Sequence, residues 1–348
     1  MKVFILIASL FVIMPVWAKA QPRVVFVSPD PKDTKNEFWT ITTYQVQKAA
    51  KDLGVELEVL YSNSHPSYYF KEIEKIVNRP KEFRPEYIMI LPIKSNIYDS
   101  LKLLAATDIK VMLVNIELTK KDQKEIGSPR DKFKNWIGSF FPDEEQAATL
   151  VAKEVGKHCK EGSDIVSING THLSNASLIR EQVFAKVAKE LGQNLRQSLY
   201  GNWKKDRVRK MLPYIEGRYP NICGFLVASD FMAEAIQESR KGGYQVCSID
   251  WTSSGIKNVM DKKQLCSVGG HYLELAFALV ALFDYHKGID FKNDFGLTYK
   301  SPFHLATIKN AKKIYQKFIL NKDSLNYKNY SKFYTKKTKY NFNILQGI

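Results

Sequence analysis

The sequence predicts an α/β protein of two similar lobes, each with a parallel sheet covered by helices on both faces. Apolar strand patterns alternate with amphipathic helix patterns along the chain, which is typical of parallel sheets. The alternation starts again near Phe140, so we expect one lobe before and one after this residue. Residues 48–54 (KAAKDLG) resemble residues 186–192 (KVAKELG), and residues 60–63 (LYSN) resemble residues 199–202 (LYGN). These two pairs of similar segments occur in the same order, which favours a duplicated lobe.

In the first lobe, residues 23–28 (RVVFVS) form a continuous apolar run, which predicts a strand buried on both faces. Residues 38–53 have apolar side chains at helical spacing and end before Gly54, a common helix stop. By the same criteria, further strands are expected at residues 55–61, 87–91 and 111–114, and further helices at residues 68–78 and 98–107.

The second lobe repeats this alternation. We expect strands at residues 164–168, 195–200, 224–228, 244–249 and 266–268, and helices at residues 177–191, 206–216, 231–240 and 255–261. A long apolar helix at 272–286, a last strand at 303–308 and a helix at 310–318 follow. Residues 321–348 have little periodicity, which predicts a loosely ordered basic, aromatic tail.

Residues 1–20 have the pattern of a secretory signal peptide. Lys2 precedes an apolar run over residues 3–14, and residues 18–20 (AKA) give a small-residue cleavage site. An uncleaved anchor is the alternative, but the run is short for a membrane span, which needs about 20 residues. We therefore expect a soluble mature chain that is exported.

The formal net charge is +16, and it is unevenly distributed. Residues 301–348 contain ten Lys and one Asp, so the basic character belongs mainly to the C-terminal end and says little about the ligand site. Together with export, this distribution argues against nucleic acid as a partner. For the tail, a solvated segment is favoured over contact with an anionic membrane surface or a partner complex.

Four cysteines are present, at positions 159, 223, 247 and 266, without the spacing of a zinc site. Buried free thiols are favoured, and a disulfide is the alternative that an oxidising compartment permits. The first strand is not followed by a nucleotide-binding glycine motif, and the chain has no Gly-x-Ser-x-Gly elbow. We therefore predict no cofactor, no metal and no catalytic residue.

Ligands of open parallel sheets bind beyond the carboxyl ends of the strands, and two facing lobes form a cleft that closes by hinge motion. Three of the four Trp after residue 20 fall at these strand ends, together with Asp, Asn and His. Aromatic faces pack against the C–H faces of sugars, and carboxylates and amides bind hydroxyls. The candidate ligand-binding residues are Asn36, Phe38, Trp39, Asn115, Trp203, Ser229, Asp230, Asp250, Trp251 and His271.

Residues 23–310 resemble the type I periplasmic binding proteins, in the sugar-binding branch that includes ribose-binding protein and the autoinducer-2 receptor. The resemblance is carried by residues 36–39 (NEFW), 111–115 (VMLVN), 180–184 (REQVF), 228–230 (ASD) and 249–251 (IDW). It implies hinge crossings near residues 138–140, 270–271 and 297–301. The first lobe would then be 21–138 with 272–299, the second 139–271 with 300–320, and the tail 321–348.

The resemblance also implies a periplasmic location and a function without chemistry. The expected protein is a monomer that captures a sugar-like solute and delivers it to the inner-membrane permease of an ABC transporter. One alternative is chemoreception, in which the closed form is presented to a membrane sensor kinase or cyclase. The other is an exported carbohydrate-active enzyme. Asn115 and Leu178 stand about where ribose binders have Asp and Arg, which makes ribose and anionic ligands doubtful.

Overall fold

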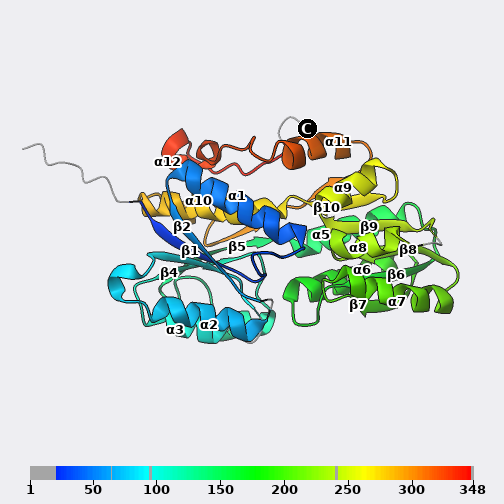
Figure 1. Cartoon of the computed structure of the whole chain (residues 1–348), viewed down its shortest axis with the longest axis horizontal. Helices are drawn as coiled ribbons and strands as arrows, with labels where there is room; N and C mark the ends of the chain where they lie inside the picture. Colours follow the sequence, from blue (N-terminus) through cyan, green and yellow to red (C-terminus); the bar gives the residue numbers. More distant parts are fainter. Residues whose placement is uncertain (1–20, 64, 94–95, 240–241, 346–348) are drawn as a thin grey trace, which may run out of the picture.

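A computed structural model describes residues 21–63, 65–93, 96–239 and 242–345. In this part of the chain two α/β lobes lie side by side along the long axis of the molecule (Figure 1). Each lobe contains a six-stranded, mostly parallel sheet, so the predicted fold class is confirmed. The predicted signal peptide, residues 1–20, lies outside the described residues.

The first sheet is parallel and has the strand order β11-β5-β4-β3-β1-β2. Its strands are β1 (Arg23–Ser28), β2 (Glu56–Tyr61), β3 (Tyr87–Ile90), β4 (Lys110–Val114), β5 (Trp136–Pro142) and β11 (Thr298–Ser301). Helices α1 (Glu37–Leu53) and α10 (Glu274–His286) cover one face, and α2 (Pro66–Val77) and α3 (Ile97–Ala105) cover the other (Figure 1). A short helix, α4 (Lys120–Ile126), follows β4.

The second sheet has the order β12-β10-β9-β8-β6-β7, in which β12 is antiparallel to β10. Its strands are β6 (Asp164–Asn169), β7 (Asn194–Tyr200), β8 (Ile222–Val227), β9 (Gln245–Asp250), β10 (Cys266–Gly269) and β12 (His304–Ala306). The helices are α5 (Glu144–Gly156), α6 (Asn175–Glu190), α7 (Lys205–Arg218), α8 (Asp230–Gln237) and α9 (Ser253–Met260). The strands follow the same spatial order as in the first sheet, as expected for a duplicated lobe.

The chain passes between the two sheets three times. It leaves β5 at Pro142 to enter α5, returns through Gly270 to α10, and crosses again between Ser301 of β11 and His304 of β12. Strand β5 was not expected from the sequence. It continues the first sheet as far as Pro142, so the expected limit at residue 138 falls inside a strand.

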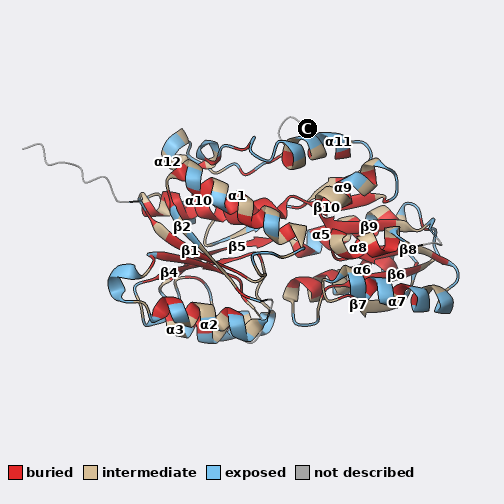
Figure 2. Cartoon of the chain, viewed as in Figure 1, coloured by how far each residue is buried: buried red, intermediate tan, exposed pale blue. Residues whose placement is uncertain are grey.

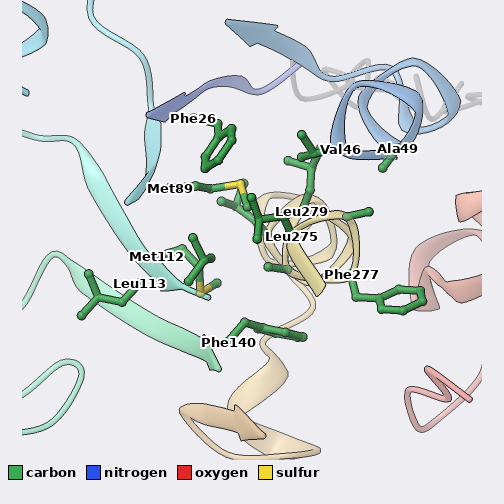
Figure 3. Packing of buried hydrophobic residues seen from close by; sticks show 14 of the residues in the cluster. Phe26, Val46, Ala49, Met89, Met112, Leu113, Phe140, Leu275, Phe277 and Leu279 are labelled. Carbon is green, nitrogen blue, oxygen red and sulfur yellow. The ribbon is translucent and has the colours of Figure 1, made fainter. Parts of the chain in front are cut away.

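Helix α10 occupies the centre of the first lobe, and twelve of its thirteen residues are buried (Figure 2). Leu275 and Leu279 lie between the strand residues Phe26 and Met89 and the α1 residue Val46 (Figure 3). Burying a large aliphatic side chain contributes about 1.5–3 kcal/mol, which explains how a helix with almost no polar face is stable here.

Residues 308–345, called here the C-terminal layer, pack along the outside of the two lobes (Figure 1). The layer contains the short helices α11 (Ala311–Ile314) and α12 (Lys332–Thr335). Tyr327 is fully buried, and its hydroxyl donates to Gln45 Oε1 at 2.8 Å. The Phe342 ring packs on Phe277, 4.8 Å between centroids. The expectation of a loose tail therefore does not describe residues 321–345, because the outward face of α10 is itself apolar and needs a cover.

The cysteines are paired, and the favoured prediction of free thiols was wrong. Cys159, just after α5, is bonded to Cys223 of β8. Cys247 and Cys266 are bonded to each other from opposite positions on the parallel neighbours β9 and β10. The sequence could not show these pairs, because 64 positions separate the first and only the sheet order brings the second together.

Candidate ligand-binding site

Backbone strain is concentrated where strands end at the junction of the lobes. Five of the eight described non-glycine residues with positive φ follow or end β4, β7 and β9. They are Asn115, Asn202, Trp203, Asp250 and Trp251, with φ between 54° and 137°. Such conformations cost roughly 1–3 kcal/mol each and persist where the surrounding fold holds them, commonly at functional sites.

An aromatic stack connects the first lobe to the hinge crossings. The ring of His271, just after β10, stacks on Phe38 of α1 with 4.6 Å between centroids. Its other neighbour is Phe303, in the third crossing, at 4.4 Å. His271 Nε2 lies 3.6 Å from Asp250 Oδ1, at the end of β9. The structure thus brings together Phe38, Asp250 and His271 from both lobes and the hinge.

Burial determines the protonation states of Asp250 and His271. Burial, reinforced by the nearby charge of Asp230, raises the pKa of Asp250 well above its ordinary range. Burial and the positive charge of Arg180 hold the pKa of His271 well below its ordinary range. His271 is therefore neutral at pH 7, and the pair offers hydrogen-bonding groups rather than an ion pair.

Trp203 lies over a buried ion pair in the second lobe. Arg180 of α6 donates from Nε and Nη2 to Glu144 at 2.6 and 3.1 Å, and from Nη1 to the Ala228 carbonyl at 2.5 Å. These bonds use three of the five guanidinium N–H groups. The guanidinium carbon is 5.8 Å from the Trp203 ring centroid. A Cβ at Gly170 would come within 2.0 Å of this ring, so only glycine allows the indole to lie there.

Asn115 connects the fourth strand of the first lobe to a second buried carboxylate. Its backbone N–H donates to Glu274 Oε1 at 2.9 Å, and Ser301 donates to Glu274 Oε2 at 2.6 Å. Burial raises the pKa of Glu274 well above its ordinary range, although both donors oppose the shift. Asn115 is therefore fixed by α10 and the third crossing together.

Among the residues that the structure describes, three buried polar atoms near the strand ends have no hydrogen-bond partner. They are Asn169 Oδ1 at the end of β6, Ser177 Oγ in the first turn of α6, and His271 Nδ1. A buried polar group left unpaired costs about 1–3 kcal/mol. A polar ligand that supplied these partners would recover that free energy on binding.

Two predicted site residues have their side chains inside the second lobe instead. The Asp230 carboxylate is fully buried and accepts hydrogen bonds from Ser248, Thr252 and Ser267. The Trp251 ring is also fully buried. It donates from Nε1 to the Ser267 carbonyl at 2.9 Å. Asp230 and Trp251 are therefore corrections to the predicted set of ligand-binding residues. The side chains of neighbouring residues at a strand end point to different sides, and these two point into the lobe.

The other predicted residues begin helices. Asn36 and Ser229 cap α1 and α8, and each side chain accepts a backbone N–H from the first turn of its helix. Trp39 is partly buried in the first turn of α1, where its ring meets the edge of Phe38 at 5.0 Å. These residues hold the helix starts at the junction, and Trp39 adds a second aromatic surface beside Phe38.

The sequence prediction omitted Glu144, Arg180 and Glu274 from the candidate site. Glu144 and Glu274 are each the first residue of the helix that follows a crossing, where an acid is ordinarily solvated. The available signal was Glu274 directly before the nine apolar residues 275–283 of α10. Arg180 belongs to a motif that carried the family resemblance.

The two lobes are in direct contact beside this group. Glu37, the first residue of α1, accepts from the Ser253 backbone N–H at 3.0 Å and from its hydroxyl at 2.8 Å. Asn175, the first residue of α6, donates to the Glu117 carbonyl at 2.7 Å. Each contact joins the start of a helix in one lobe to the other lobe.

Two cavities in the described residues are not suited to a sugar at the junction. One of about 20 Å³ lies behind His271 and has room for a water molecule only. Another of about 240 Å³, lined by Arg84, Tyr87 and Lys110, lies at the amino ends of β3 and β4, away from the junction. Within the described ranges, no cluster of His, Cys, Asp and Glu forms a metal site, and no helix is long and apolar enough to cross a membrane.

This chain belongs to the periplasmic binding protein domain family, whose model matches residues 30–288. The predicted family resemblance is thereby confirmed. Proteins of the family bind solutes and are not enzymes, and the family implies a periplasmic location. Among curated proteins, no significant match to the chain was found.

Solved structures share the fold over most of this chain. A periplasmic sugar-binding protein from Pseudomonas fluorescens is 23% identical with a TM-score of 0.82, covering 92% of this chain and 98% of its own. An ABC transporter solute-binding protein from Actinobacillus succinogenes, with bound D-allose, is 16% identical with a TM-score of 0.73 over 84% and 100%. The arabinose-transporter protein of Shewanella sp. ANA-3, with bound L-arabinofuranose, is 16% identical with a TM-score of 0.73 over 87% and 97%.

Proposed function

We propose that this protein captures a neutral sugar or sugar-like solute between its lobes and delivers it to an ABC transporter of the inner membrane. The observation that carries the proposal is the grouping of Phe38, Asp250 and His271, which joins both lobes and the hinge within contact distance. Aromatic faces suit the C–H surfaces of a sugar ring, and buried acceptors select its hydroxyl pattern.

The buried charges favour a neutral ligand over an anion. Near the junction, Glu144, Asp250 and Glu274 are buried and Arg180 is the buried cation that accompanies them. Arg180 is already paired with Glu144. An anionic ligand would add negative charge to a site where burial already raises the pKa of each of these carboxyl groups. The hydroxyl groups of a neutral ligand, in contrast, can both donate and accept hydrogen bonds.

The solved neighbours support the same ligand class. Two of them contain bound D-allose and L-arabinofuranose, and a third is a galactofuranose-binding protein. Two of the three are described as ABC transporter components. These sugars guide the choice of test compounds.

The test is a thermal-shift screen of residues 21–348, unfolded and refolded to remove bound ligand, against neutral monosaccharides, sugar acids and sugar phosphates. A ligand at 100 times its Kd adds about 2.7 kcal/mol of stability, so a neutral sugar should raise the Tm clearly. Hits are measured by calorimetry. If no neutral sugar binds, or if anionic sugars bind best, the proposed ligand class is wrong.

Two variants test the site. Trp203→Ala and Asp250→Asn should each weaken sugar binding at least tenfold, through loss of an aromatic face or of a carboxyl group. Tyr214→Ala and Asp206→Asn are the matched controls, because Tyr214 is 81% exposed and the Asp206 side chain 79% exposed on α7. Normal affinity in both site variants would remove the site from the junction.

Delivery is tested with the partner permease in proteoliposomes. The sugar-loaded protein should stimulate its ATPase activity, and the unloaded protein should do so less. A protein that binds sugar tightly but stimulates no permease would belong with a membrane sensor instead.

A further inference from the structure

The C-terminal layer, residues 308–345, carries most of the net charge of the exported chain. It holds ten Lys and one acid, Asp323, whereas residues 21–300 contain 40 Lys and Arg against 35 Asp and Glu. The layer contains no Arg. Eight of its lysines are exposed, at positions 309, 312, 313, 322, 328, 336, 337 and 339.

These lysines are displayed from a fixed backbone. The underside of the layer is anchored by Tyr327 on α1, and by Ser331 and the backbone N–H of Lys332 on the Asp284 carboxylate of α10. At the other end, Phe318 packs against Trp251 of the second lobe, 5.9 Å between ring centroids. The layer extends over both lobes (Figure 1). Its inner side chains are buried, and the eight exposed lysines face solvent.

Large apolar side chains are exposed among the lysines. Ile308, Leu320 and Tyr334 are 53%, 64% and 40% exposed, and they are three of the eight large hydrophobic residues exposed in the described chain. Lys328 Nζ lies 5.1 Å from the Tyr334 ring centroid, and Lys336 Nζ lies 4.7 Å from that of Phe333. Lysines beside exposed apolar and aromatic side chains are the composition of surfaces that bind at a bilayer interface.

We propose that the C-terminal layer binds the surface of an anionic phospholipid bilayer, which keeps the protein beside the membrane. The lysines are spread along the layer and are point charges without the paired geometry of Arg, which suits a diffuse negative surface better than a shaped protein site. Each Lys near such a surface contributes about 1 kcal/mol. The exposed Ile308, Leu320 and Tyr334 side chains add apolar contact with the interface.

The experiment is co-sedimentation of residues 21–348 with vesicles of pure phosphatidylcholine or of phosphatidylcholine mixed with phosphatidylglycerol. The protein should bind the mixed vesicles, bind the neutral ones at least tenfold more weakly, and lose binding as salt is raised. Equal binding to both vesicles, or none to either, would overturn the proposal.

A layer variant and a control variant locate the surface. The layer variant has Gln at Lys309, Lys312, Lys313, Lys328, Lys336 and Lys337. The control variant has Gln at Lys71, Lys75, Lys102, Lys186, Lys189 and Lys210, which are exposed elsewhere. The layer variant should lose at least tenfold in vesicle affinity, and the control should lose less than threefold. Equal losses of vesicle affinity in the two variants would mean that the net charge of the protein alone, and not the layer, is responsible for binding.

Sugar binding is measured on the same variants, so that this proposal fails independently of the proposed function. Both variants should keep the Tm and the sugar affinity of the unmodified protein. If the layer variant binds vesicles normally but no longer stimulates the permease, the layer contacts a protein rather than lipid and the proposal is wrong.

Discussion

At the scale of single residues, two aspartates at neighbouring strand ends have different roles. Asp230 and Asp250 follow similar apolar strands, and the sequence gives no means to separate them. The distinction arises from the backbone, because Asp250 has φ 137° and lies beside His271 while Asp230 begins α8. Ser248 of β9, Ser267 of β10 and Thr252, which caps α9, then enclose Asp230. Residue type was predictable here, and side-chain direction was not.

Asp230 should control part of the pH dependence of stability. Burial raises the pKa of Asp230 to about 6 from its ordinary 3.8. The native state therefore holds this proton more tightly than the unfolded state, and its contribution to stability is full below about pH 4 and is lost as the pH rises through about 6. Asp230→Asn should flatten the fall in Tm over that interval, which thermal melts at several pH values measure. Parallel curves for the two proteins would contradict this role.

At the scale of elements, the continuous apolar strands β1, β3 and β8 were predictable because they are buried on both faces. Strand β5 was missed because Gly138 and Pro142 interrupt its apolar residues, and α5 was missed with it. The ordered packing of the C-terminal layer could not be predicted either, because its sequence has no periodic pattern of apolar residues. Its aromatic side chains extend singly from irregular backbone, and they pack against α1 and α10.

The pairing of the cysteines gives an element-scale prediction. Because Cys159–Cys223 and Cys247–Cys266 are both bonded, a maleimide should label no thiol in the unreduced protein, even after denaturation, and four after reduction. Mass spectrometry counts the labels. Replacing Cys159 and Cys223 together by Ser should lower the free energy of unfolding by about 2–4 kcal/mol. Labelling of all four without reductant would restore the free-thiol interpretation.

The C-terminal layer should resist trypsin despite its lysines. Tyr327→Ala empties a fully buried site, and the free energy of unfolding should fall by about 3–5 kcal/mol. The same variant should be cut rapidly within residues 309–339, while the unmodified protein is cut slowly. Tyr214→Ala, at an exposed site, is the control and should change stability by less than about 0.5 kcal/mol. Rapid cleavage of the unmodified layer would mean that this segment is loose after all.

At the scale of the whole molecule, the lobes are held by three crossings and by contacts between helix starts. The repeated sequence segments predicted the two lobes, but they did not predict which helix N-termini would contact the other lobe. Glu37→Ala removes the contact with Ser253, and sugar should then dissociate about tenfold faster, because a hydrogen bond to a charged group contributes about 1.5–3 kcal/mol. Stopped-flow release measures this rate. Glu56→Ala, an exposed acid on β2, should leave it unchanged. An unaltered rate in Glu37→Ala would show that this contact does not hold the lobes closed.

The packing of Tyr327 against Gln45 joins positions 282 residues apart and has a consequence for folding. A folding chain can build much of its second lobe from contiguous sequence. Its first lobe instead waits for α10 and then for the final segment that covers Phe277. The earliest translated part of the protein is therefore among the last to reach its native state, because contacts between distant segments form slowly.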